Sequence, residues 1–145
     1  MARYAISGRA TIAGTAALPL VSLYAVAASR PKLVEVGIFN TTAVAVAVSL
    51  NRLTTAGTPG VGLTEVAEDD PDQVALATGF AGHTAGPTIT GEVRRTTLGA
   101  AIGSGVIWTF GPNGLAIPAG TANGVGLIVP TGTGQVLDYS LIWDE

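Results

Sequence analysis

The stretch LVEVGIFNTTAVAVAVSLNRL, from Leu33 to Leu53, indicates the fold more plainly than any other part of the chain. Branched residues at 34, 36 and 38 alternate with other residues before Asn40-Thr41-Thr42, and valines at 44, 46 and 48 do so after it. A period of two places alternate side chains on opposite faces of a strand. The pattern predicts a β-hairpin at the centre of a two-sheet core. The small residues of its second arm face either the opposite sheet or another subunit: Ala45, Ala47 and Ser49.

Length and composition narrow the functional classes. The chain has 145 residues, which suits one domain with a single core. Charged residues make up only 12% and apolar residues 48%, so we expect much of the surface to contact other protein. The net charge of −3 disfavours binding to nucleic acid or to an anionic membrane. Cysteine is absent, which excludes disulfides and zinc–thiolate sites.

The N-terminal region is harder to assign. Ala2 to Ser7 can form a short strand or an extended arm, and Ala10 to Ala17 can form a loop or a short helix. We expect an N-terminal arm or loop over residues 1–17 and a β-sandwich domain over residues 18–145. The uncharged stretch Ala10 to Ser29 has the length of a signal peptide, but its Ala, Thr and Gly content favours a structural segment.

The remainder of the chain reads as strands separated by turns. We expect strands at 18–27, 92–98, 105–110, 115–118, 125–129 and 136–143, a return to the sheet at 74–78, and surface loops at 54–73 and 79–90. The turns contain Pro-Asn-Gly and Asn-Gly, which tolerate positive φ. Stretches with a helical period are missing between the strands, which disfavours an α/β fold. The sequence predicts an all-β antiparallel β-sandwich, most similar to a jelly roll.

Residues that carry chemistry are few. Half of the ten acidic residues lie between Glu65 and Asp72, without the spacing of a calcium-binding loop, so a solvated loop is expected. His83 is the one histidine and is expected in a loop. No serine lies in a nucleophile-elbow motif. We therefore expect no catalytic residue, no metal site, no cofactor and no enzymatic activity.

The aromatic residues of the C-terminal strands share faces. Trp108 lies on one face with Phe110, and Tyr139 lies on one face with Trp143. Side chains of this kind anchor cores and are also enriched at subunit contacts. We expect them mainly in the core.

Three segments resemble a known class of proteins: VEVGIFNTTAVAVAVSLNRLTTAGTPG, GVIWTFGPNGLAIPAGTANGVGLI and TGQVLDYSLIWDE. They are similar to small, cysteine-free structural proteins of tailed bacteriophages, in particular capsid decoration (cement) proteins. The similarity spans about Leu33 to Glu145. It implies a jelly-roll or related β-sandwich, a homo-oligomer that is a trimer, and binding to the major capsid protein of the assembled shell.

The same resemblance implies further expectations. The protein would be made in the cytoplasm of a bacterial host and would lie on the capsid surface of the virion. An extended N-terminal arm, residues 1–9, would reach a neighbouring subunit, with Arg3, Tyr4 and Arg9 as its anchors. Two alternatives stay open: a phage tail or fibre component, and a carbohydrate-binding or enzymatic β-sandwich, which needs a cleft with convergent polar and aromatic groups.

Overall fold

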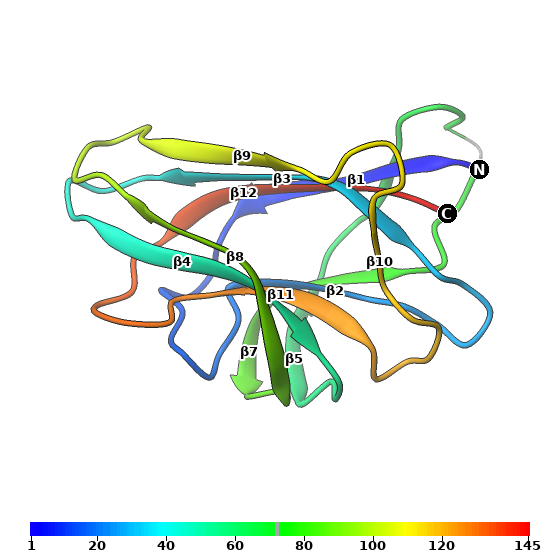
Figure 1. The fold of residues 1–145 in the computed structure, drawn as a ribbon, viewed down its shortest axis with the longest axis horizontal. Coiled ribbons are helices and arrows are strands. Elements are labelled where there is room, and N and C mark those ends of the chain that lie inside the picture. Colours follow the sequence, from blue (N-terminus) through cyan, green and yellow to red (C-terminus); the bar gives the residue numbers. More distant parts are fainter. Residues whose placement is uncertain (72) are drawn as a thin grey trace.

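The computed structural model describes residues 1–71 and 73–145, which form two antiparallel sheets packed face to face (Figure 1). Sheet A contains β10 (Leu115–Ala116), β3 (Lys32–Asn40), β12 (Leu137–Asp144), β1 (Arg3–Arg9) and β6 (Val66–Ala67), in that order, with β9 (Gly105–Thr109) also paired to β3. Sheet B contains β5 (Thr58–Gly62), β7 (Thr78–Ala85), β2 (Val21–Tyr24), β11 (Gly124–Ile128), β4 (Val46–Leu53) and β8 (Ile89–Leu98), in that order.

The strand order is that of a jelly roll. Strand β1 pairs with β12, β2 with β11, β3 with β9, and β4 with β8, as in one long antiparallel ribbon. Rolling this ribbon up adds the pairs β12–β3 and β11–β4, and it places β1 and β3 in one sheet and β2 and β4 in the other. The predicted all-β jelly-roll sandwich is confirmed, and the hairpin of β5 and β7 adds two strands at the edge of sheet B beside β2.

The predicted hairpin over Leu33 to Leu53 is wrong in its pairing. Both strands form, but β3 lies in sheet A and β4 lies in sheet B. The five residues 41–45 cross between the sheets, and Asn40 holds the crossing by donating from Nδ2 to the carbonyls of Val44 (2.7 Å) and Gly99 (3.0 Å). The apolar faces of the two strands therefore oppose each other across the core, where a hairpin would have placed them side by side.

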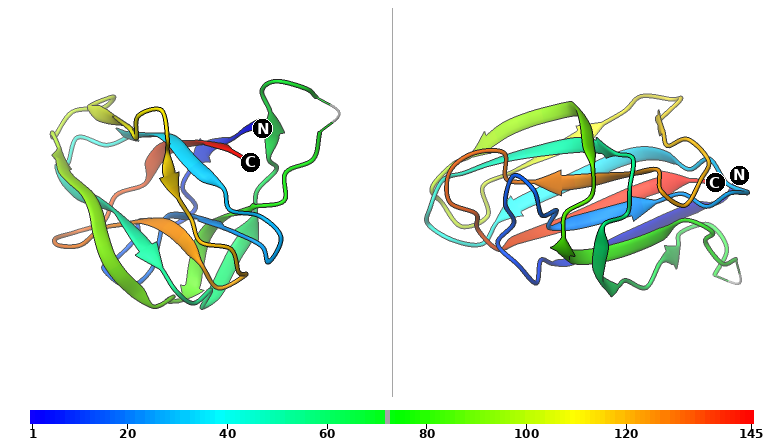
Figure 2. Two further views of the ribbon diagram at one scale, coloured as in Figure 1. Left: turned by 45° about the vertical axis from the view of Figure 1, so that its right-hand side comes forward. Right: turned by 90° about the horizontal axis from the view of Figure 1, so that it is seen from below.

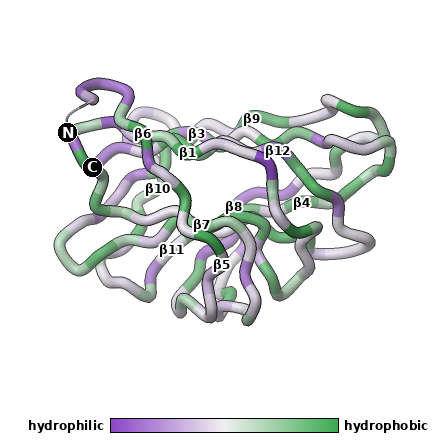
Figure 3. Tube along the Cα trace, turned by 180° about the vertical axis from the view of Figure 1, so that it is seen from behind, coloured by the Kyte–Doolittle hydropathy of each residue, from purple (hydrophilic) through white to green (hydrophobic). Residues whose placement is uncertain are grey.

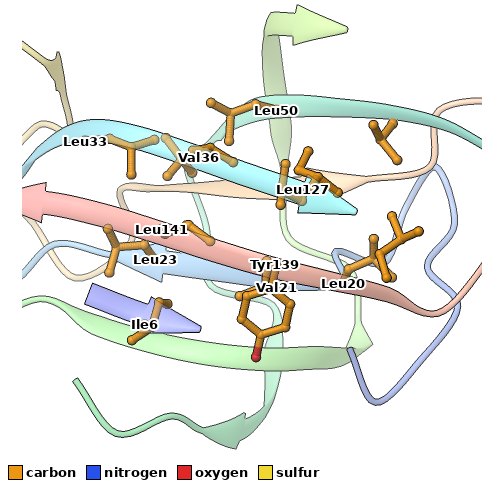
Figure 4. Close-up of a cluster of buried hydrophobic side chains, with 14 of the residues drawn as sticks. Ile6, Leu20, Val21, Leu23, Leu33, Val36, Leu50, Leu127, Tyr139 and Leu141 are labelled. Carbon is orange, nitrogen blue, oxygen red and sulfur yellow. The ribbon is translucent and has the colours of Figure 1, made fainter. Parts of the chain in front are cut away.

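The core lies between the two sheets. Figure 4 shows Ile6, Val36, Tyr139 and Leu141 of sheet A beside Leu50 and other apolar side chains of sheet B, and all of them are buried. Burying a side chain of this size contributes about 1.5–3 kcal/mol. Tyr139 and Trp143 lie in this core, as expected from the alternation of β12, and Trp108 and Phe110 pack against its margin.

The N-terminal segment is not an arm. Residues 3–9 form β1, which is paired on one side with β12 over its whole length and on the other with β6. Its alternate residues Tyr4 and Ile6 are buried in the core. The β-sandwich therefore begins near residue 3, and only residues 10–20 form an irregular connection.

Other boundaries differ in detail. Strand β2 is shorter than the predicted 18–27, and the predicted loop 79–90 is mostly strand β7. Residues 74–77 lie outside the strands. The C-terminal strands agree with prediction to within a few residues. Within residues 1–71 and 73–145, no helix is long and apolar enough to cross a membrane.

Candidate functional site

The outer faces of the two sheets differ, and this difference defines the candidate site. Along β1 the buried residues Tyr4 and Ile6 alternate with residues that point away from the core. The paired strands extend this outward row across sheet A. Every member except Gly37 is partly or fully exposed. We call this surface the sheet A outer face, and its residues are Arg3, Ala5, Ser7, Arg9, Glu35, Gly37, Phe39, Val66, Gly105, Ile107, Thr109, Asp138, Ser140, Ile142 and Asp144.

Two ion pairs lie on this face. Arg3 binds Asp144 through Nε (2.8 Å) and Nη2 (3.1 Å), and Arg9 binds Asp138 in the same two-bond manner (2.7 and 3.1 Å). The hydrogen bond from Arg9 lowers the pKa of Asp138. Each arginine is cross-strand to its partner in the register of β1 and β12, so the pairing follows directly from the strand alignment. The two pairs leave this part of the surface nearly neutral.

Between the ion pairs the face is built mostly from small side chains, with Ile142 opposite Ala5 as the exception. Ser7 and Ser140 are opposite each other, and Gly37 is the next residue across. A Cβ atom on Gly37 would lie 2.6 Å from Ser140 Oγ and 3.3 Å from the Phe39 ring, so a larger residue would require Ser140 to move. The side chains in this area therefore project little from the sheet, so another flat protein surface can approach it closely.

The three residues predicted as contacts are divided by the structure. Arg3 and Arg9 lie on the sheet A outer face with 43% and 65% of their side chains exposed. Tyr4 points into the core, is 4% exposed, and stacks on Trp143 with 5.9 Å between ring centroids. The prediction of Tyr4 as a surface anchor is therefore wrong, because its place in the alternation of β1 turns it inward.

The outer side of the middle strands of sheet B, β2 and β11, is by contrast covered by the chain itself, and the edge strands β5 and β8 stay largely exposed. The connections 54–57 and 86–88 join β4 to β5 and β7 to β8, and the strand order requires both to pass β11 and β2. Seen from below, green segments run across the orange β11 and the blue β2 (Figure 2). Thr54 and Thr88 join the two connections through N–H···O=C (3.0 Å), and Thr88 N donates to Thr55 Oγ1 (2.7 Å). These crossings close the lower side of β2 and β11.

A buried polar cluster lies under these crossings. Ser22 Oγ is 2.8 Å from His83 Nε2, and the two residues are 0% and 2% exposed. Asn51 donates from Nδ2 to Ser49 Oγ (2.7 Å), and both of these residues are buried. Burial also raises the pKa of the Tyr24 hydroxyl to about 12. We call Ser22, Tyr24, Ser49, Asn51 and His83 the underside cluster.

His83 belongs to β7 and is buried, so the prediction of a loop residue is wrong. A serine beside a histidine is the beginning of a nucleophile–base pair. Here, however, Nδ1 of His83 is buried without a hydrogen-bond partner, so no carboxylate orients the ring. Both side chains are also closed off from solvent, and burial lowers the pKa of His83. The pair is placed to hold β2 and β7 together.

Sequence patterns contained a partial signal for this cluster. Ser22, Ser49 and Asn51 alternate with Val21, Leu23, Val48 and Leu50, which marks them as lying on the face opposite the core. Such a pattern normally indicates a solvated face. Here the face is buried instead, because it is covered by the crossing connections, which come from other parts of the sequence.

The acidic loop serves as an anchor to the chain termini. Glu145 accepts hydrogen bonds from the amides of Leu76 (2.9 Å) and Ala77 (2.7 Å), and Glu65 accepts one from Gly79 (2.9 Å). Asp69 accepts one from the amide of Arg3 (2.9 Å). Asp72 lies outside the described residues, and in the rest of the chain no three acidic or histidine side chains gather as metal ligands do.

Comparisons with protein-family models, curated proteins and solved structures find no match to this chain. No pocket opens in the part of the chain that the structure describes. The bare sheet A outer face, opposite a sheet whose middle strands the chain covers itself, is the feature on which a functional proposal can rest.

Proposed function

We propose that this protein is a structural component of a bacteriophage virion, which decorates and stabilises the capsid by binding the assembled shell of major capsid protein. The observation that carries the proposal is the contrast between the two outer faces. The middle strands of sheet B are closed by the crossings 54–57 and 86–88, and the sheet A outer face is left uncovered across all of its strands. A protein that works by contact needs one such available surface.

The chemistry of the sheet A outer face suits a flat protein surface. Four of its five charged residues are paired within the chain, as Arg3 with Asp144 and Arg9 with Asp138, and mostly small residues lie between the pairs. Paired charges offer little electrostatic steering, so the attraction would come from close packing. In this proposal Arg3 and Arg9 flank the contact, and they can also exchange their partners for groups on the shell.

Stabilisation follows from selective binding. A protein that binds the assembled shell better than free subunits shifts the equilibrium towards assembly by mass action. Repetition over a symmetric shell multiplies a modest contact. Neither effect needs a catalytic group. Ser22 and His83, the pair that resembles a nucleophile and its base, are buried away from solvent.

The carbohydrate-binding alternative is weaker. Sugar sites use exposed aromatic rings with convergent polar groups. Among the described aromatic residues, only Phe39 has more than a third of its surface exposed, and Tyr4, Tyr24, Tyr139 and Trp143 are buried. A tail or fibre location uses the same kind of surface, so it is an outcome to be separated by experiment.

The test is binding of the purified protein to empty capsids of the virus that encodes it, compared with unassembled capsid subunits. The proposal expects binding to the capsids alone. Binding to tails, or equal binding to free subunits, would contradict it.

A further inference from the structure

The free edge of β9 differs from the edges formed by β5, β8, β6 and β10, and from the part of β1 beyond its two-residue pairing with β6, which ends in the charged Arg9. Strand β5 contains Pro59 and a register shift, and β8 carries Glu92, Arg94 and Arg95 and two register shifts. Strands β6 and β10 have two residues each. Proline, charge, bulges and short length are the features that protect edges from pairing with another chain. Strand β9, with the sequence Gly-Val-Ile-Trp-Thr, has none of them and pairs regularly with β3.

The register shows which backbone groups the edge presents. Phe110 N donates to Val34 O (3.0 Å) and Asn40 N donates to Ser104 O (2.7 Å), which are the hydrogen-bonded pairs at the two ends of the β3–β9 ladder. In an antiparallel ladder these pairs alternate with pairs whose amides and carbonyls point away from each other. The amides and carbonyls of Gly105, Ile107 and Thr109 therefore point out from the free edge.

The side chains beside this edge are apolar. Ile107 is 56% exposed, and part of β9 is coloured as hydrophobic in Figure 3. Phe39 lies across Gly105, because a Cβ atom on this glycine would collide with the Phe39 ring. The free backbone edge of β9 and the apolar side chains of Ile107 and Phe39 thus lie next to each other at the margin of sheet A.

From this arrangement we propose that β9 pairs antiparallel with β9 of a second copy of this chain, about a twofold axis at Ile107. In that register Ile107 is opposite its own counterpart, and Gly105 is opposite Thr109 of the other copy. No charged residues are opposite each other across the junction, so the edge is compatible with itself. The same self-pairing of β8 about Arg94 or Arg95 would oppose like charges, which leaves β9 as the compatible edge.

The twofold axis stands perpendicular to sheet A, because antiparallel strands in one sheet are related in this way. Both copies consequently present the sheet A outer face to the same side. If the proposed function holds, one dimer can engage a shell through two faces at once, which raises its avidity. This consequence rests on the proposed function, and the pairing itself does not. The pairing also gives a dimer, where the family resemblance implies a trimer.

The test is sedimentation of the purified protein over a concentration series, without any capsid. The proposal expects a concentration-dependent dimer. It expects monomers for Ile107→Lys, which places two like charges together, and for Thr109→Pro, which removes an outward amide and no bond to β3. The matched control is Val61→Lys, which changes a branched residue that is 66% exposed on the edge of β5; this variant should still dimerise.

Hydrogen exchange identifies the contact itself. The amides of Gly105, Ile107 and Thr109 should gain protection as concentration rises, and those of Val106 and Trp108, already directed at β3, should not change. A wild-type protein that stays monomeric at all concentrations, or an oligomer that survives both β9 variants in folded form, would overturn the proposal. Circular dichroism of each variant verifies the fold. Shell binding is measured separately, so failure of one proposal does not imply failure of the other.

Discussion

Ser22 Oγ lies 2.8 Å from Nε2 of His83, beneath sheet B, where neither side chain reaches solvent. The ring also approaches Tyr24, with 6.2 Å between ring centroids, and its Nδ1 atom has no hydrogen-bond partner. A second proton on this imidazole would add a buried charge without a counter-ion. The underside cluster is therefore stable only with neutral His83.

Stability should consequently fall in weak acid. Burial lowers the pKa of His83 from 6.5, so below about pH 6.5 the unfolded chain binds a proton that the folded chain does not. The free energy of unfolding should decrease as pH falls from about 7 to about 5, until the folded-state pKa is reached. Urea denaturation at several pH values measures this. His83→Gln, which cannot take up the proton, should show a smaller decrease, and equal decreases in both proteins would contradict the assignment.

Strand β1 should be essential for folding. Ile6→Ala removes a fully buried side chain between the sheets and should cost about 2–5 kcal/mol of unfolding free energy. The neighbouring Ser7→Ala, on the exposed face, should change stability by less than about 0.5 kcal/mol. Chemical denaturation of both variants checks the difference. An Ile6→Ala protein as stable as wild type would indicate that residues 1–9 are an arm after all.

Glu145 should hold the segment around residues 76 and 77. Its carboxylate accepts bonds from the amides of Leu76 and Ala77 and from Trp143 Nε1 (2.9 Å). Glu145→Ala should speed amide exchange at positions 76 and 77 by roughly tenfold or more, which corresponds to about 1.4 kcal/mol. Glu145→Gln keeps one oxygen acceptor and should have the smaller effect. Unchanged exchange in Glu145→Ala would show that the segment is held by other contacts.

Local sequence patterns predicted the position of most strands. They did not predict how the strands pair, because pairing depends on segments that are far apart in the sequence. Alternation around Val36 and Val48 is a property of neighbouring residues, so both strands were predictable. The sheet to which each strand belongs depends on the crossing at 41–45 and on distant partners. Strand β3 pairs with β12, about a hundred residues later in the chain, and β4 pairs with β11. A β-hairpin and a sheet-to-sheet crossing share the same alternation, and the loop Asn40-Thr41-Thr42 did not distinguish them.

In the candidate site, too, some residues could be placed from the local sequence and others could not. Arg3 and Arg9 were predicted as surface residues and lie on the sheet A outer face, because alternate positions of β1 point outward. The alternation of Tyr4 and Ile6 with these arginines already indicated that Tyr4 turns inward, had the segment been read as a strand. Burial of His83 was not predictable, since it depends on the crossings 54–57 and 86–88, which close under sheet B only in the folded chain.

In the proposed function, the sheet A outer face binds an assembled shell. A bulky residue in its small-residue centre should prevent close contact without unfolding the chain, and Ser7→Trp makes this change at an exposed position. Thr97→Trp, exposed on β8 of sheet B, is the matched control. Because four of the five charged residues of the face are paired with one another, wild-type binding should vary little between about 50 and 200 mM salt.

The decisive measurement is cosedimentation of the wild type and these two variants with empty capsids of the virus that encodes the chain. Wild type and Thr97→Trp should sediment with the capsids, Ser7→Trp should remain in the supernatant, and none should bind unassembled capsid subunits. Equal occupancy by Ser7→Trp, or a wild-type protein that ignores intact capsids, would contradict the account.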